Sequence, residues 1–210
     1  MNVRNNIGRH LAHMNSRPRH SDQPSRALES ESERLAVAIS AQTGSGALQV
    51  AEGLAEYLHT HSRAGEPPWG VPPAWMIAHR SIETILSLVR AGNVILVGWG
   101  AIAVASKLHD VFHVRLVASL ERRIARIQTR EHLGRDEALA FIERSDRGCA
   151  RYVKRYFHRE VADVLLYGLV INTDHFADVE VVRLVGDAVL NRQRSLRFGV
   201  RIVHARETLI

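Results

Sequence analysis

The chain has 210 residues, 46% of them hydrophobic, which suffices for one sizeable α/β domain with tails. A single cysteine, Cys149, excludes a disulfide framework and a cysteine-based metal cluster, so we expect a cytoplasmic protein. The sequence contains no run of about 18 apolar residues, so we predict no membrane span. The formal charge of +6, carried almost wholly by arginine, favours partners that bear phosphate groups, such as nucleotides, nucleic acids or anionic surfaces.

Residues 1–34 differ from the rest of the chain. The first 21 residues contain no acid, are rich in Arg, Asn, His and Ser, and show no strong apolar periodicity. We expect residues 1–34 to form a disordered basic tail ahead of a folded domain at 35–194. Residues 195–210 are expected to form a C-terminal extension, either as an edge strand or as a contact between copies in a homo-oligomer.

From residue 35 onward, apolar runs alternate with amphipathic stretches. Residues 35–41 predict a buried strand, and 46–58 predict a helix with one apolar stripe. The further predicted elements, in chain order, are a loop at 59–73, a helix at 74–91, a strand at 93–98, a helix to about 108, a strand at 112–118, helices at 119–130 and 134–158, a strand at 166–172 and a helix at 178–194. Such alternation predicts a parallel sheet with helices on both faces.

The turn between the first strand and the first helix carries Thr43-Gly44-Ser45-Gly46. Backbone N–H groups of such a turn and of the following helix point at one place, and the helix dipole adds positive potential. The turn therefore predicts a phosphate cradle, and the alternative is a tight packing turn. A Walker P-loop ends in Gly-Lys-Ser/Thr, whereas Ala47 and Leu48 follow here, so the usual lysine is missing.

Four loops follow the carboxyl ends of the predicted strands, at 42–46, 98–100, 118–119 and 172–174. Ligands of open α/β sheets bind beyond these ends, so together the loops predict a nucleotide site. Arg122, Arg126 and Arg130 recur every four residues just after one strand end, either as a grip on a nucleotide or as a solvated basic face.

A second arginine stripe runs along the helix at 134–158. It consists of Arg144, Arg147, Arg151 and Arg155, with Lys154 beside it. Like charges at this spacing repel one another without an anion, so we interpret residues 134–160 as a mobile arginine lid over a transferring phosphate. Asp146 lies within the stripe and is expected to bind a sugar hydroxyl or to orient the arginines, the alternative being a surface salt bridge.

These motifs resemble those of the cytidylate kinase-like family, a branch of the P-loop nucleoside monophosphate kinases, over about residues 35–176. Residues 39–46 are similar to the family's Ser-Arg-Gln-x-Gly-Ser-Gly-Gly turn, and residues 94–101 to a strand that ends in Gly-Arg-Gly-Ala. Residues 120–126, 146–156 and 163–173 match as well. The resemblance implies a three-layer α/β/α P-loop NTPase fold with a parallel sheet and a helical arginine-rich lid. It also implies ATP-dependent phosphoryl transfer, with Mg²⁺, to a nucleoside monophosphate, nominally CMP or dCMP.

Carried over by position, the resemblance implies three sets of site residues, with the metal ligands left unassigned. The residues implied to bind ATP are Gln42, Thr43, Gly44, Ser45, Gly46, Ala47, Arg122 and Arg126. Those implied to bind the acceptor are Gly98, Trp99, Gly100 and Asp146. Arg147 and Arg151 are implied to act in catalysis from the lid, and we predict that Lys154, which lies beside them, acts with them.

The sequence also departs from the family pattern. Ala47 and Gln49 stand where the Walker lysine and the magnesium-binding Ser/Thr would be, and Ala41 and Trp99 replace arginines. We hypothesise that Lys154 and the lid arginines supply the missing charge. One alternative is a catalytically inactive relative that binds a nucleotide and acts by binding or assembly. A basic nucleic-acid-binding module is a second alternative, although few aromatic residues interleave with the basic ones.

Overall fold

The computed structural model describes residues 35–62, 66–72, 82–98 and 111–197. The predicted N-terminal tail, the first half of the helix expected at 74–91, the helix expected to reach residue 108 and most of the C-terminal extension therefore lie outside the described residues. Trp99 and Gly100, two of the residues predicted to bind the acceptor, lie outside them as well.

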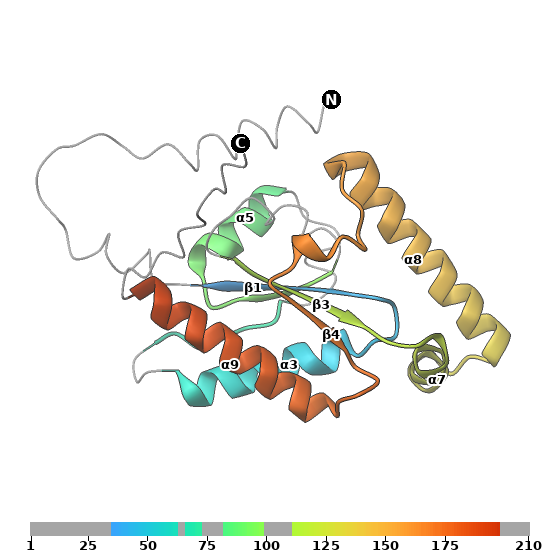
Figure 1. Ribbon diagram of the computed structural model, residues 1–210, viewed down its shortest axis with the longest axis horizontal. Helices are drawn as coiled ribbons and strands as arrows, with labels where there is room; N and C mark the ends of the chain where they lie inside the picture. The colour runs from blue at the N-terminus through green and yellow to red at the C-terminus, as the bar shows by residue number, and fades with distance from the viewer. Residues whose placement is uncertain (1–34, 63–65, 73–81, 99–110, 198–210) are drawn as a thin grey trace, which may run out of the picture.

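The described strands form one parallel sheet in the order β2-β1-β3-β4 (Figure 1). They are β1 (Ala36–Ala41), β2 (Ile95–Val97), β3 (Val111–Val117) and β4 (Leu169–Asn172). The central strand β1 pairs with two strands far along the chain, Val37 with Ile95 and Ala38 with His113. The predicted parallel α/β sheet is confirmed.

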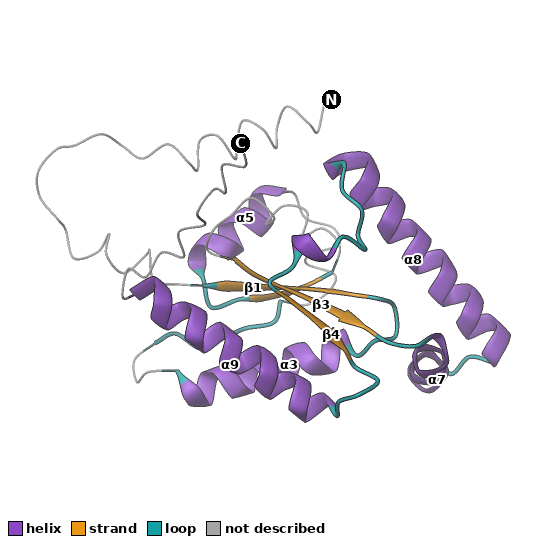
Figure 2. Ribbon diagram, in the orientation of Figure 1, coloured by secondary structure: helices purple, strands orange, loops and turns teal. Residues whose placement is uncertain are grey.

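The described helices flank this sheet (Figure 2). They are α3 (Ala47–His61), α5 (Ile82–Ala91), α7 (Leu120–Glu131), α8 (Arg135–Phe157) and α9 (Asp178–Arg197). In Figure 1, α3 and α9 lie against one face, α5 lies on the other side, and α7 stands beyond the carboxyl ends of the strands. None of the described helices combines the length and the apolar character that crossing a bilayer requires.

The alternation of side chains along β1 builds two cores. Leu35, Val37 and Ile39 pack into the core shared with α3 and α9, whereas Ala36 and Ala38 pack into the core shared with α5. Both faces of the strand are buried, which explains its continuous apolar run. A third cluster joins α7 to α8 and is centred on the buried side chains of Ile124, Ile127, Ala138 and Ile142.

The predicted boundaries agree with the structure to within a few residues at most ends. Gly92 has a left-handed φ of 68° directly after α5, a conformation typical of the glycine that ends a helix. The strand expected at 166–172 begins only at Leu169. The residues before it form a 3₁₀ turn, η1 (Val164–Leu166), because the Asp163 carboxylate accepts a hydrogen bond from the Leu165 N–H at 3.0 Å.

Candidate functional site

The turn between β1 and α3 is fixed to the end of β3. The Gln42 N–H donates to the Leu116 carbonyl, and the Gln42 side-chain oxygen accepts from the Ala118 N–H, both at 3.0 Å. Gly44 and Gly46 take left-handed φ angles of 87° and 91°, which suit glycine. The turn therefore has a set position at the carboxyl end of the sheet.

The N-terminus of α3 has the properties of an anion site. Its N-cap residue, Gly46, provides no capping side chain, and the first turn of the helix contains no acid. The first N–H groups of a helix have no acceptor within the helix, and they carry the positive end of its dipole. The end of α3 therefore offers free donors and positive potential to an anion.

The Arg126 guanidinium lies directly over this helix end. A Cβ built on Gly46 would overlap Nη1 of Arg126, so only glycine leaves room for the guanidinium. Nη2 donates to Asp178 at 2.6 Å, but Nη1 is buried and has no hydrogen-bond partner among the described residues. A cation beside the positive end of a helix is unfavourable, and a buried donor without a partner costs roughly 1–3 kcal/mol. An anion that accepts hydrogen bonds from Nη1 of Arg126 and from the first N–H groups of α3 would relieve both the charge repulsion and the cost of the buried donor.

A cavity of about 280 Å³ opens beside the turn. It is lined by Ala41, Gln42, Thr43, Gly44, Gly46, Ala47, Leu48, Val71, Pro72, Val97, Gly98 and Arg130. The structure thus brings the predicted Gly98 together with the turn. It also adds a cation, Arg130, which shares the four-residue spacing of Arg122 and Arg126.

A clamp of polar side chains holds the turn against α7 and α8. Asp146 accepts from the Thr43 N–H at 3.0 Å and from Arg123, and Arg123 donates to the Thr43 carbonyl at 2.8 Å. The Thr43 hydroxyl donates to Ser145 at 2.9 Å. Sequence reasoning missed Arg123, which is only 6% exposed. Its spacing could have indicated that it is buried, because Arg123 lies four residues before the buried Ile127 on the same helix face.

Two further predicted loops meet at the other side of the turn. The Thr173 hydroxyl donates to the Ser45 carbonyl at 3.2 Å, and Asp174 accepts from the Ser119 N–H at 2.8 Å. Burial raises the pKa of the Asp174 carboxyl, but the hydrogen bonds from Ser119 and the charge of Arg122 outweigh it and hold that pKa below its usual range. Arg122 donates to the Asp174 carbonyl at 3.4 Å.

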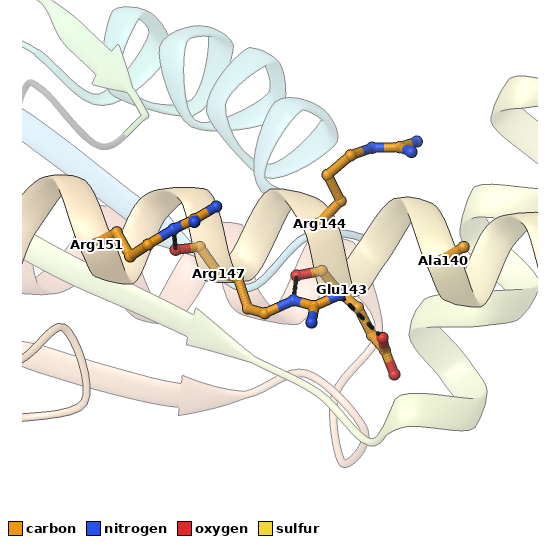
Figure 3. Close-up of a pocket in the computed structure, with 5 residues that line it drawn as sticks. All are labelled: Ala140, Glu143, Arg144, Arg147 and Arg151. Atoms are coloured by element: carbon orange, nitrogen blue, oxygen red, sulfur yellow. Dashed lines mark hydrogen bonds and ion pairs between the residues drawn. The ribbon is translucent and has the colours of Figure 1, made fainter.

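The residues predicted to act from the lid contact other residues of α8 and of the segment that follows this helix. Arg147 bonds the carbonyl and carboxylate of Glu143, Arg151 bonds the Arg147 carbonyl, and Lys154 pairs with Glu160 at 2.7 Å. The ion pair with Glu160 raises the pKa of Lys154. Figure 3 shows Arg147 and Arg151 beside a groove of about 310 Å³ on the surface of α8. The charge of the stripe is thus offset in part by acids of its own segment.

Cys149 is buried on α8, and burial raises the pKa of its thiol to about 11. The thiolate is the reactive form, so we expect native protein to react with iodoacetamide at pH 8 about 100-fold more slowly than protein unfolded in guanidinium chloride. Mass spectrometry of quenched samples gives both rates. Equal rates would mean that the thiol is accessible and ionises normally.

Three comparisons with known proteins bear on this arrangement. A model of the Cytidylate kinase-like family matches residues 73–175. A cytidylate kinase from Sulfolobus acidocaldarius is 31% identical over 72 residues, a match that spans 34% of this chain and only 40% of that protein. The family match begins after the turn at 42–46, so the interpretation of the turn depends on its own geometry.

Two solved structures are also similar. An uncharacterised protein from Eubacterium ventriosum superposes with a TM-score of 0.59 at 18% identity, over 74% of this chain and 98% of that one, which shows a shared fold. A shikimate kinase from Bacteroides thetaiotaomicron has the same coverage at 14% identity, but its TM-score of 0.43 supports no conclusion about this chain. The family match confirms the predicted resemblance: residues 73–175 are similar to the cytidylate kinase-like family.

Proposed function

We propose that the chain binds a nucleoside triphosphate at the turn 42–46 and transfers its γ-phosphoryl group to a nucleoside monophosphate, nominally CMP or dCMP, within a P-loop kinase fold. The observation that carries the proposal is Nη1 of Arg126, which lies over the uncapped N-terminus of α3 and has no hydrogen-bond partner among the described residues. The match to the cytidylate kinase-like family over residues 73–175 supports nucleotides as the source of the anion.

The proposed chemistry is positioning and charge stabilisation. Phosphoryl transfer needs little covalent chemistry from a protein, because the barrier falls mainly when the phosphates are held in line and their charge is neutralised. Here the backbone amides of the turn and of α3 would hold the donor phosphates, and the Arg126 guanidinium over this helix end would offset the negative charge of the phosphates. Arg130 lines the cavity and would add charge where Ala47 replaces a lysine.

The family also implies magnesium, and the described residues do not fit a magnesium site. No group of three His, Cys, Asp or Glu among them could hold a metal ion. Asp146 bonds Arg123 and Thr43, and Asp178 bonds Arg126. One oxygen of Asp174 is buried with no partner in the described part of the chain, but the charge of Arg122 acts on that carboxylate and disfavours a cation there. We assign no step to a metal.

The proposal predicts that Arg126→Gln weakens ATP binding by about 10- to 100-fold, the range of a charge-assisted hydrogen bond. Calorimetry with magnesium-ATP measures this affinity, and coupled ADP release with CMP, dCMP, UMP, AMP and GMP identifies the acceptor. The matched control is Arg194→Gln, at an exposed position near the far end of α9, for which ATP affinity is expected to be unchanged. Wild-type protein that does not bind ATP would refute the proposal.

A second candidate is an inactive relative that only binds the nucleotide. The observations in its favour are Ala47 in the turn and the pairing of Arg147 and Lys154 with Glu143 and Glu160 instead of the turn. ATP binding without turnover for any acceptor of the panel would favour this candidate over the kinase.

A further inference from the structure

Arg115 lies on the face of the sheet opposite to Arg126. Its neighbours on β3, Val114 and Leu116, belong to the core shared with α3 and α9. Side chains alternate along a strand, so Arg115 points to the side of α5. In the sheet it pairs with Ser40, which is followed directly by Ala41 in the cavity wall.

Arg115 is a buried cation with neutral partners. It is 8% exposed, and its Nη1 donates to the Ser40 hydroxyl at 3.1 Å and to the Tyr167 hydroxyl at 3.3 Å. The guanidinium also lies 5.4 Å from the centre of the Tyr167 ring. Among the described residues, Nε and Nη2 make no hydrogen bond. Three of the five N–H donors of the guanidinium therefore have no partner within the described part of the chain.

Among the residues that the structure describes, the charges around Arg115 do not balance. Arg123, at 6% exposed, is a second buried arginine near the carboxyl end of the sheet, and it takes one oxygen of Asp146. The other oxygen of Asp146 accepts from the Thr43 N–H. No carboxylate of the described residues bonds Arg115. A buried charge without a counter-charge is costly, so the surroundings of Arg115 favour an anion.

We propose that Arg115, oriented by Ser40 and Tyr167, binds the phosphate group of the acceptor nucleoside monophosphate. This inference rests on the proposed function. In-line transfer requires the acceptor phosphate and the donor phosphates on opposite sides of the group transferred. Arg126 lies at the turn on the side of α3 and α9, and Arg115 lies near the same turn on the other face of the sheet. The two arginines thus provide one cation for each partner of the reaction.

The test is calorimetry with CMP and with ATP, each alone, on the full chain. Arg115→Gln is expected to weaken CMP binding by about 10- to 100-fold, as for loss of a charge-assisted contact, and to leave ATP affinity within twofold of wild type. Cytidine, which lacks the phosphate, is expected to bind more weakly than CMP and equally to both proteins. Unchanged CMP affinity in a folded Arg115→Gln protein would overturn the inference and leave the ATP site standing.

A second variant and a second ligand complete the test. If Arg115→Gln does not fold, Arg115→Lys replaces it, because this variant keeps the charge but loses the planar fork of the guanidinium. We expect the CMP affinity of Arg115→Lys to fall at least threefold with ATP affinity unchanged. A CMP affinity equal to that of wild type would overturn the inference.

Inorganic phosphate is the remaining probe. If it binds as tightly as CMP and loses affinity equally in the variant, the site holds free phosphate and the assignment to an acceptor is wrong.

Discussion

Gly44→Ala is expected to lower the free energy of unfolding by about 3 kcal/mol. The residue has a φ of 87°, and an alanine in the left-handed region costs roughly 1–2 kcal/mol. In addition, a Cβ at this position would lie 2.7 Å from the backbone carbonyl oxygen of Arg123. Backbone cannot rotate away as a side chain can, so α7 or the turn must shift, at a further cost of about 1–3 kcal/mol.

Urea unfolding followed by circular dichroism measures this loss. Gly70→Ala is the matched control, because nothing lies within 4 Å of a Cβ built there and the residue has no positive φ. We expect the control to stay within about 0.5 kcal/mol of wild type. If the two variants were equally stable, the close approach of α7 to the turn would be absent in solution.

Asp146→Ala is expected to cost about 2–3 kcal/mol of stability. The substitution leaves the buried Arg123 without its counter-charge and the Thr43 N–H without its acceptor. Breaking a buried ion pair costs about 3–5 kcal/mol, and we take a lower value because the Asp146 side chain is 33% exposed. Urea unfolding of the variant gives the value, and the double variant with Arg123→Met gives the coupling between the two residues.

The same two helices provide the control. Glu121 of α7 and Arg135 of α8 form a two-pronged pair at 2.7 and 2.8 Å, but their side chains are 69% and 57% exposed. Exposed pairs contribute little, so we expect Glu121→Ala to cost less than about 1 kcal/mol. Equal losses for Asp146→Ala and Glu121→Ala would show that burial of Arg123 does not decide the strength of the clamp.

Much of the fold follows from local pattern. The apolar run at 35–41 and the stripe of α3 depend only on residues a few positions apart, and so does the left-handed Gly92. The late start of β4 was missed because an aspartate side chain competes for the Leu165 N–H. The strand propensity of the apolar run 164–166 does not reveal that competition.

The candidate site was predicted only in part. The turn, Arg126 and Gly98 follow from their places after strands, and the structure brings them together. The clamp joins Thr43 to Asp146 across 103 positions, and no local pattern encodes such a contact. Arg115 did leave a signal, since it is the one charged residue within the strand sequence VFHVRLV. The assigned roles of Arg147, Arg151 and Lys154 stay predictions.

The strand order has a consequence for how the protein folds. Because β1 pairs only with strands that come much later in the sequence, the sheet is built from long-range contacts, which form slowly. The turn is held by Leu116 and Ala118, so it takes its shape only once β3 has joined β1. During synthesis, a nascent chain that ends before β3 cannot hold the turn in place, so the turn reaches its final conformation late in folding.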